Sequence, residues 1–282
     1  MGRARAVLGV LLVVTALGFG SWWFFARDTT VPGLGACDPE PPGALVPAVV
    51  AELPHDADAF TQGLVVTEGE LWESTGLRGE SDLRQVDPAT GEVLEQQALP
   101  PEQFGEGLAV RGDAGLVQLT WTSGRALVWD RDPLAQVASF DYEGEGWGLT
   151  AIGGERFAMS DGTDVLAVRN TDDFEVIERF TVARAGGEVG ALNELDWDGE
   201  HLWANRYQTN EILRIDMDCG VVDAVVDAST LVERAAELAA DVGLERDFAE
   251  RDVLNGIAST GDGFYVTGKR WPVMFEVTFE PG

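Results

Sequence analysis

Five stretches of the chain follow one template, and this repetition limits the possible folds more than any other feature of the sequence. Each stretch opens with a short segment that ends in leucine or isoleucine, and a second apolar segment follows about eight residues later. The opening segments are Gln62-Gly63-Leu64, Glu106-Gly107-Leu108, Trp147-Gly148-Leu149, Asn193-Glu194-Leu195 and Asn255-Gly256-Ile257. The first four recur every 41 to 46 residues, and short strands with glycine-rich turns at this period are typical of a β-propeller. We therefore expect an all-β fold, a five-bladed β-propeller.

The fifth stretch is shorter than the others, because it runs only from Asn255 to Phe279 and lacks a last strand. An open blade would expose a strand edge, so the ring is expected to close. The apolar segment at residues 48–53, which precedes the first stretch, is the natural strand to complete the fifth blade. Proline and glycine are frequent at residues 28–47, which indicates a linker. We expect the propeller domain to occupy residues 48–282.

The interval between the fourth and fifth stretches is longer, at 62 residues, and its sequence predicts an inserted helix. Residues 230–233 fit a capping box, and Gly243 is a typical helix end. Apolar residues recur on one face of the expected helix, namely Leu231, Ala235, Leu238, Ala239 and Val242. This periodicity predicts one helix of roughly twelve residues between blades four and five.

The net charge of the chain is −30, from 19 basic and 49 acidic residues. Such a surface repels nucleic acid phosphates and anionic lipid headgroups, and it favours solubility. The charge therefore excludes a nucleic-acid partner and says little about chemistry. We expect a monomer.

The N-terminal region, residues 1–27, contains an uncharged apolar segment at residues 7–26 that ends in four aromatic residues. This length spans a bilayer, and aromatic residues suit its interface. Arg3 and Arg5 precede the segment, so the domain is expected outside the cytoplasm, anchored to the membrane. A cleaved signal peptide, which would release a secreted protein, has the same general pattern and stays open as an alternative.

Cys37 and Cys219 are the two cysteines of the sequence. In an exported protein such a pair favours a disulfide, which here would connect the linker to the domain. Residues 34–37 also resemble a bacterial lipobox, so lipidation of Cys37 is the alternative. This motif lies eleven residues beyond the apolar segment, which is far for a normal lipobox, and we expect the disulfide.

The residues with useful chemistry fall at two positions of the template. In a propeller the innermost strands line the central axis, so the residues that open these strands surround one mouth of the channel. These residues are Gln62, Glu106, Trp147, Asn193 and Asn255. The residues at the end of each second strand are Thr75, Trp121, Asp161, Tyr207 and Lys269. A buried carboxylate is costly unless it is paired, so Glu106 indicates either a functional site or an ion pair.

Seven segments, in order, closely resemble the plant-type, papaya-like glutaminyl-peptide cyclotransferases, a family that also occurs in bacteria. They are His55–Leu64, Phe104–Leu108, Gly146–Leu149, Leu192–Leu195, Trp203–Asn205, Asp252–Ile257 and Thr267–Pro272. A single segment such as Gly105-Glu106-Gly107 would be weak evidence for the family. Seven matching segments between about residue 48 and residue 279 are specific evidence.

The resemblance implies a propeller enzyme that converts the N-terminal glutamine of peptides or proteins into pyroglutamate and releases ammonia. It implies that Glu106 is the acid/base and that Lys269 belongs to the same catalytic site. The substrate pocket implied by the motifs consists of Phe60, Gln62, Trp121, Trp147, Asn193 and Tyr207. Relatives carry tryptophan where this chain has Tyr207, so the pocket keeps an aromatic wall and gains a hydroxyl group.

The residue types agree with this chemistry. One carboxylate placed between the attacking amine and the leaving amine can take a proton from the first and give it to the second. An aromatic pocket of low polarity raises the pKa of such a carboxyl group toward neutral pH. Lys269 can stabilise negative charge that develops on the carbonyl oxygen, and the amides of Gln62 or Asn193 can hold that oxygen.

Two other functions stay open at this point. A calcium-dependent propeller lactonase would gather residues such as Glu106, Asn193, Asn255 and Asp161, although Lys269 would repel a catalytic cation. A binding propeller without catalysis is the second alternative. No zinc motif is present, and His55 is expected to form local hydrogen bonds. We expect no cofactor requirement for catalysis, while the family resemblance allows a structural calcium ion of unknown ligands.

Overall fold

The structure of the protein is a computed structural model that describes residues 37, 39–113 and 115–282. The expected membrane segment at residues 7–26 and half of the expected linker, residues 28–36 and 38, lie outside the described residues. No helix within the described ranges has the length and apolar character needed to cross a membrane.

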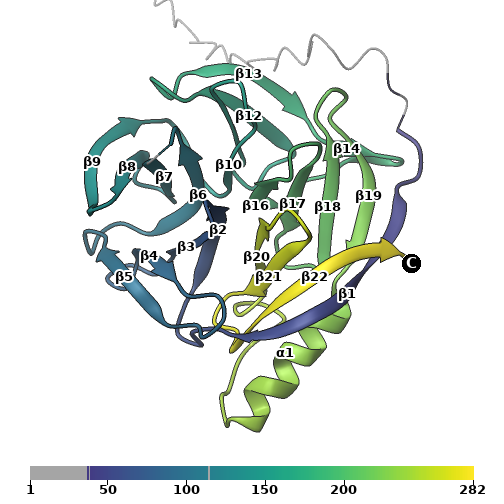
Figure 1. Cartoon of the computed structure of the whole chain (residues 1–282). Coiled ribbons are helices and arrows are strands. Elements are labelled where there is room, and N and C mark those ends of the chain that lie inside the picture. Colours follow the sequence, from purple (N-terminus) through teal and green to yellow (C-terminus); the bar gives the residue numbers. More distant parts are fainter. Residues whose placement is uncertain (1–36, 38, 114) are drawn as a thin grey trace, which may run out of the picture. The chain divides into compact units, whose positions relative to one another are not determined.

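Each of the first three templates forms a four-stranded antiparallel sheet whose strands are neighbours in chain order (Figure 1). The first sheet contains β2 (Thr61–Thr67), β3 (Glu70–Thr75), β4 (Asp82–Val86) and β5 (Val93–Ala98). The second contains β6 (Gly105–Arg111), β7 (Gly115–Thr120), β8 (Arg125–Arg131) and β9 (Leu134–Asp141). The third contains β10 (Leu149–Ala151), β11 (Arg156–Met159), β12 (Val165–Asn170) and β13 (Val176–Thr181).

The fourth and fifth templates share one larger sheet. The fourth supplies β16 (Leu192–Trp197), β17 (Leu202–Arg206), β18 (Glu211–Asp216) and β19 (Val221–Asp227). The fifth supplies β20 (Leu254–Ser259), β21 (Phe264–Gly268) and β22 (Val273–Pro281). A small hairpin of β14 (Ala183–Arg184) and β15 (Gly187–Glu188) pairs with the outer strand β19.

The N-terminal strand β1 (Gly43–Pro54) completes the fifth group of strands, as the sequence predicted, because it pairs antiparallel with β22. It is longer than the expected segment at 48–53. Its first three residues, 43–45, pair in parallel with residues 224–226 of β19, and this pairing joins the fourth and fifth groups into one sheet. Residues 43–47 therefore belong to a strand and not to a linker, because two neighbouring strands satisfy their backbone hydrogen bonds.

Five first strands lie beside one another, each contacting the next in the order β2, β6, β10, β16, β20 and back to β2. The glycine that four of the five templates carry allows this close approach. A Cβ atom on Gly107 would lie 2.4 Å from the backbone nitrogen of Leu149, and one on Gly148 would lie 2.0 Å from the carbonyl oxygen of Asn193. Only glycine fits at such distances.

The fourth template has Glu194 where the others have glycine. Its carboxylate accepts backbone N–H groups from Leu64 at 3.1 Å and from Ile257 at 2.9 Å. The side chain thus ties the first strand of the fourth template to the first strands of the first and fifth templates.

Apolar clusters fill the space between consecutive groups of strands. Trp72 of the first group packs with Leu116 and Trp129 of the second, and equivalent clusters join each later group to its successor. The last cluster brings Leu71 of the first group together with Met274 of the fifth. Each fully buried large apolar side chain contributes about 1.5–3 kcal/mol, so these contacts stabilise the ring of sheets along its whole circumference.

The inserted helix is α1 (Ser229–Asp241), which lies outside β1 and β22 (Figure 1). The helix ends just before Gly243, as the sequence predicted. Gly243 has φ +76°, and the N–H of Leu244 donates to the carbonyl of Ala239. The predicted capping box at 230–233 is wrong. The N-cap is Ala228, which is buried at the end of the preceding strand and forms no side-chain cap.

The predicted apolar face of α1 is also too long. Leu231, Ala235 and Ala239 are buried, whereas Val242 is 67% exposed because it follows the last helical turn. Arg234 of the helix forms an ion pair with Glu52 of β1 at 2.8 Å.

The expected disulfide is confirmed, since Cys37 is bonded to Cys219 with their Cα atoms 5.9 Å apart. Cys219 lies in the turn between β18 and β19, so the bond connects the segment before β1 to the fourth group of strands.

Candidate active site

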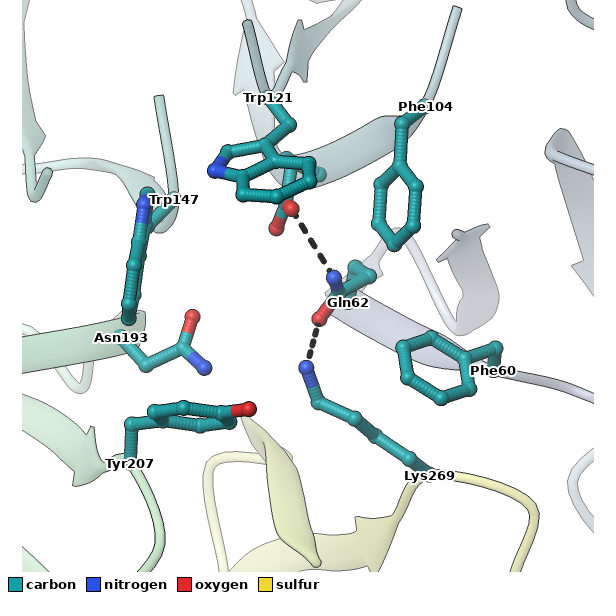
Figure 2. A pocket seen from close by; sticks show the side chains of 9 residues that line it. Phe60, Gln62, Phe104, Trp121, Trp147, Asn193, Tyr207 and Lys269 are labelled. Atoms are coloured by element: carbon teal, nitrogen blue, oxygen red, sulfur yellow. Dashed lines mark hydrogen bonds between the residues drawn. The ribbon is translucent and has the colours of Figure 1, made fainter. Parts of the chain in front are cut away.

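A pocket of about 220 Å³ opens where the five first strands meet. All eight side chains expected to form the site line it, together with one that was not expected, Phe104 (Figure 2). The lining residues are Phe60, Gln62, Phe104, Glu106, Trp121, Trp147, Asn193, Tyr207 and Lys269.

The template explains why these residues converge. Gln62, Glu106 and Asn193 are each the second residue of a first strand, so their side chains occupy equivalent places around the ring. Trp121, Tyr207 and Lys269 each follow directly after the second strand of a group. Side chains from both positions line the pocket together with Phe60 and Phe104.

Polar groups at the floor of the pocket form a short chain of hydrogen bonds. Nε2 of Gln62 donates to Oε1 of Glu106 at 3.0 Å, and Oε1 of Gln62 accepts from Nζ of Lys269 (Figure 2). All three side chains are at most 4% exposed. The side-chain oxygen of Asn193 has no hydrogen-bond partner among the residues that the structure describes. A buried acceptor of this kind is ready for an N–H donor from a ligand.

Both ionisable groups of the floor have strongly shifted pKa values. Burial raises the pKa of Glu106 well above its ordinary value, the positive charge of Lys269 opposes this rise, and the negative charge of Glu145 adds to it. Burial also lowers the pKa of Lys269 to about 8, against the opposing effect of the Glu106 charge. Shifts of this kind occur where a carboxyl group and an amine exchange protons near neutral pH.

Aromatic rings enclose the polar floor. Phe104 packs edge-on against Phe60 and Trp121, with ring centres 6.1 and 5.6 Å apart, and Trp147 packs edge-on against Tyr207 at 5.5 Å. The ammonium group of Lys269 lies 4.9 Å from the ring centre of Phe60 and 5.4 Å from that of Tyr207. These contacts stabilise a cation in a site from which water is largely excluded.

The turn that carries Lys269 is held by buried polar contacts. The N–H of Lys269 donates to the carbonyl of Val253 at 2.9 Å. The next residue, Arg270, has a left-handed backbone with φ +58° and donates from Nε to the buried carboxylate of Asp252 at 2.6 Å. This ion pair compensates for the conformational cost at Arg270 and fixes the direction of Lys269.

Three positions of the two predicted sets lie outside the pocket lining, namely Thr75, Asp161 and Asn255. The amide nitrogen of Asn255 donates to the carbonyl of Thr61 at 3.1 Å and to Oε1 of Gln62 at 3.4 Å. Asp161 accepts from the backbone and hydroxyl group of Thr163. The lactonase hypothesis needed Asn255 and Asp161 beside Glu106 and Asn193, so it loses two of its four groups.

Two contributors were missed in the sequence. Phe104 lies two residues before Glu106, within a segment that carried the family resemblance, and an aromatic residue at that distance was the available signal. Glu145 accepts the indole N–H groups of Trp121 at 2.7 Å and of Trp147 at 2.9 Å. Its spacing from Trp147 gave no indication of this role.

The structural calcium ion that the family resemblance allows stays a prediction without named ligands. Among the described residues, no three or more His, Cys, Asp or Glu side chains are grouped to hold a metal ion. Both oxygens of Glu194 already accept backbone N–H groups, whose positive ends would repel a cation. His55 forms local hydrogen bonds, as expected, to the carbonyl of Trp271 and to Glu73.

The fold and the site together define a class of protein. It is an all-β, propeller-like domain that presents a buried carboxyl group, a buried amine and aromatic walls to a small, partly apolar ligand. The family model described as glutamine cyclotransferase matches residues 28–279, and the chain belongs to this family.

Two relatives support the assignment. The chain is 37% identical over 233 residues to a glutaminyl-peptide cyclotransferase of Arabidopsis thaliana, in an alignment that covers 81% of this chain and 70% of that protein. The crystal structure of the Myxococcus xanthus glutaminyl cyclase superposes with a TM-score of 0.77 at 34% identity, covering 86% of this chain and 99% of that one.

Proposed function

We propose that this protein is a glutaminyl-peptide cyclotransferase, which converts the N-terminal glutamine of peptides or proteins into pyroglutamate and releases ammonia. The observation that carries the proposal is the placement of Glu106 at the floor of an aromatic pocket, hydrogen-bonded to Gln62, in a chain that belongs to the glutamine cyclotransferase family.

The proposed reaction is an intramolecular acyl transfer in which Glu106 moves one proton. The neutral α-amine attacks the γ-carboxamide carbon and forms the ring C–N bond, and the Glu106 carboxylate accepts a proton from that nitrogen. The protonated Glu106 then gives this proton to the leaving amine as the C–N bond of the carboxamide breaks, which yields ammonia. The raised pKa of Glu106 suits this role because the carboxyl group must both accept and release a proton near neutral pH.

Lys269 is proposed to stabilise the negative charge that develops on the carboxamide oxygen in the transition state. Its ammonium group lies in a pocket of low polarity, where a charge–charge interaction is stronger than in water. Gln62 holds Lys269 and Glu106 in their relative positions through its amide.

Substrate binding is assigned to the remaining lining residues. The side-chain oxygen of Asn193, which has no hydrogen-bond partner in the described part of the chain, is proposed to accept a hydrogen bond from the substrate α-amine. Phe60, Trp121, Trp147 and Tyr207 would hold the glutamine side chain folded over its own amine. A folded substrate has already lost the conformational freedom that opposes ring closure, which supplies much of the rate.

We also propose that the propeller has five blades. Five first strands contact one another in a closed order, and five apolar clusters join successive groups of strands, the last of them joining the fifth group to the first. In this description β1 is the outer strand of the fifth blade.

The domain is proposed to act outside the cytoplasm, as a monomer attached to the membrane by residues 7–26 or released after cleavage. The disulfide between Cys37 and Cys219 supports export, because such bonds persist in oxidising compartments.

The proposed function is tested by incubating the purified protein with peptides that begin with glutamine and measuring ammonia release. Matched peptides that begin with asparagine are the control, because their carboxamide is one methylene shorter and cannot close the five-membered ring. Ammonia release from the glutamine peptides alone is expected. The proposal would be contradicted if none of the glutamine peptides released ammonia.

A further inference from the structure

Glu145 connects two walls of the pocket that come from different sheets. It lies in the loop between β9 and β10, and its Oε2 atom accepts the indole N–H of Trp121 at 2.7 Å and that of Trp147 at 2.9 Å. Trp121 follows the last residue of β7, in the second sheet, whereas Trp147 precedes β10, in the third. One carboxylate oxygen therefore fixes the spacing of two aromatic walls.

This bridge determines how the two rings face the pocket. An indole has a single N–H donor, so a hydrogen bond to it restricts rotation of the ring about its side-chain bonds. Bonds to a charged acceptor are stronger than neutral ones, which favours one orientation for each ring even though Glu145 itself is exposed at the rim.

The charge of Glu145 also acts on the floor of the pocket. Three ionisable groups influence Glu106 or are influenced by it, namely Lys269, Glu145 and the phenol of Tyr142. Lys269 favours the charged form of Glu106, and Glu145 disfavours it. Tyr142 is neutral at working pH because burial raises its pKa to about 12. Glu145 is thus the one negative group in this set that opposes ionisation of Glu106.

We infer that Glu145 is a positioning residue for the reaction: its Oε2 atom holds Trp121 and Trp147 in the orientation that closes the pocket around glutamine, and its charge acts together with burial against ionisation of Glu106. The inference rests on the proposed function for its effect on turnover. The two parts of the role are separable, because one depends on an oxygen acceptor and the other on a negative charge.

Two variants separate the parts. Glu145→Gln retains a side-chain oxygen at the bridging position and loses the charge, whereas Glu145→Ala loses both. Glu143, an exposed carboxylate two residues earlier in the same loop, supplies matched controls as Glu143→Gln and Glu143→Ala. All five proteins are compared at equal folded fraction, which is checked by thermal unfolding.

For Glu145→Ala we expect kcat/KM for glutamine peptides to fall about tenfold, mainly through KM, since two hydrogen bonds to a charged group are lost. The acidic limb of its kcat/KM profile should move to lower pH. For Glu145→Gln we expect the same movement of the limb with a smaller change in KM. The Glu143 variants should match the wild type in both measurements. The inference would be overturned if the Glu145 variants had the same KM as the Glu143 variants and the acidic limb of their kcat/KM profile lay at the same pH.

A readout without turnover distinguishes failure of this inference from failure of the proposed function. In protein labelled with ¹⁵N, the indole N–H signals of Trp121 and Trp147 should move in Glu145→Ala and stay unchanged in Glu143→Ala. A ¹³C carboxyl titration should show a lower pKa for Glu106 in Glu145→Gln. If the wild type released no ammonia, the proposed function would fail, while unchanged indole signals and an unchanged Glu106 titration would overturn the role of Glu145.

Discussion

Gln62 donates a hydrogen bond from its amide nitrogen to Oε1 of Glu106 at 3.0 Å. The other end of the same amide accepts from Lys269, so a neutral group lies between the two ionisable side chains. A direct ion pair would hold the Glu106 carboxylate charged and unavailable as a proton donor. The intervening amide keeps both groups close while burial raises the pKa of Glu106, which is the arrangement that proton shuttling requires.

The first prediction concerns the proton shuttle itself. Glu106→Gln retains the size and hydrogen-bonding capacity of the side chain and removes the exchangeable proton, so kcat should fall by at least ~10²-fold. Asp161→Asn is the control, because Asp161 lies outside the pocket lining and bonds to Thr163. Thermal unfolding should show that both variants are folded. Near-normal turnover of Glu106→Gln would show that another carboxylate, first of all Glu194, moves the proton.

The second prediction concerns the alkaline limb of the kcat profile. Burial lowers the pKa of Lys269 to about 8, so its ammonium is charged below that pH and loses its charge above it. We expect kcat at saturating substrate to decline as pH rises through about 8, and Lys269→Ala to lower kcat at all pH values because the transition-state charge is no longer stabilised. A Lys269→Ala variant with an unchanged kcat would contradict the assigned role.

The third prediction concerns the aromatic wall. Trp147→Ala removes a ring that packs against Tyr207 at 5.5 Å, which opens the pocket and admits water. We expect an increase in KM as well as a decrease in kcat, because the lost contacts act on the bound substrate and on the polarity around Glu106. Steady-state kinetics with a single glutamine peptide separates the two effects. An unchanged KM would indicate that the ring does not touch the substrate.

The fourth prediction concerns stability and pH. Burial raises the pKa of Asp196 to about 7, from an ordinary value of 3.8. The folded state therefore prefers the protonated form, and its stability should decrease as pH rises from about 4 to about 7. The total loss from this group is on the order of 4 kcal/mol. Asp196→Asn retains an acceptor for the N–H of Ser259 and should be more stable than the wild type at pH 8.

Asp198 provides a control of opposite sign for this fourth prediction. Although burial raises its pKa, hydrogen bonds from His201 and Trp203 outweigh that effect and lower it below the ordinary value. Its stabilising contribution is present above the ordinary aspartate pKa and is lost as pH falls below it. Asp198→Asn should therefore lower the free energy of unfolding at pH 8. Urea unfolding at pH 4 and pH 8 tests both variants, and equal responses would refute the argument from burial.

The fifth prediction concerns metal removal. The proposed mechanism uses a proton on Glu106 and a charge on Lys269, so treatment with a strong zinc chelator should leave the wild-type rate unchanged. Dialysis against the chelator, followed by assays with and without added zinc, makes the comparison. A rate that falls on dialysis and returns with zinc would require a metal ligand set that the described carboxylates do not supply.

The periodic features of the sequence were sufficient to predict the repeated strands and the two positions that form the site. Close packing around the centre requires glycine at one template position, so residues such as Gly107 and Gly148 mark the register of each first strand. Once the register is known, the side chain before each glycine must lie at the same mouth. The pairing of β1 with β22 also followed from the sequence, because an incomplete last repeat needs a strand from elsewhere.

Other features depended on contacts between residues that are distant in the chain. The sequence could not show that Asn255 bonds to Thr61 and Gln62 and stays outside the pocket lining while Asn193 lines the pocket. The two residues occupy equivalent template positions and differ only in their neighbours. The helix start at Ser229 was likewise set by the strand that runs into it and not by a capping sequence.

The sequence by itself therefore determined the repeat, its register and the residue types at the mouth, since these follow from local periodicity and from the space available to each side chain. Only the tertiary structure decided which of these residues meet, how Gln62 separates Glu106 from Lys269, and that Glu145 bridges two tryptophans. Hydrogen bonds and desolvation depend on distances between separate strands, and those distances exist only once the sheets have packed around one centre.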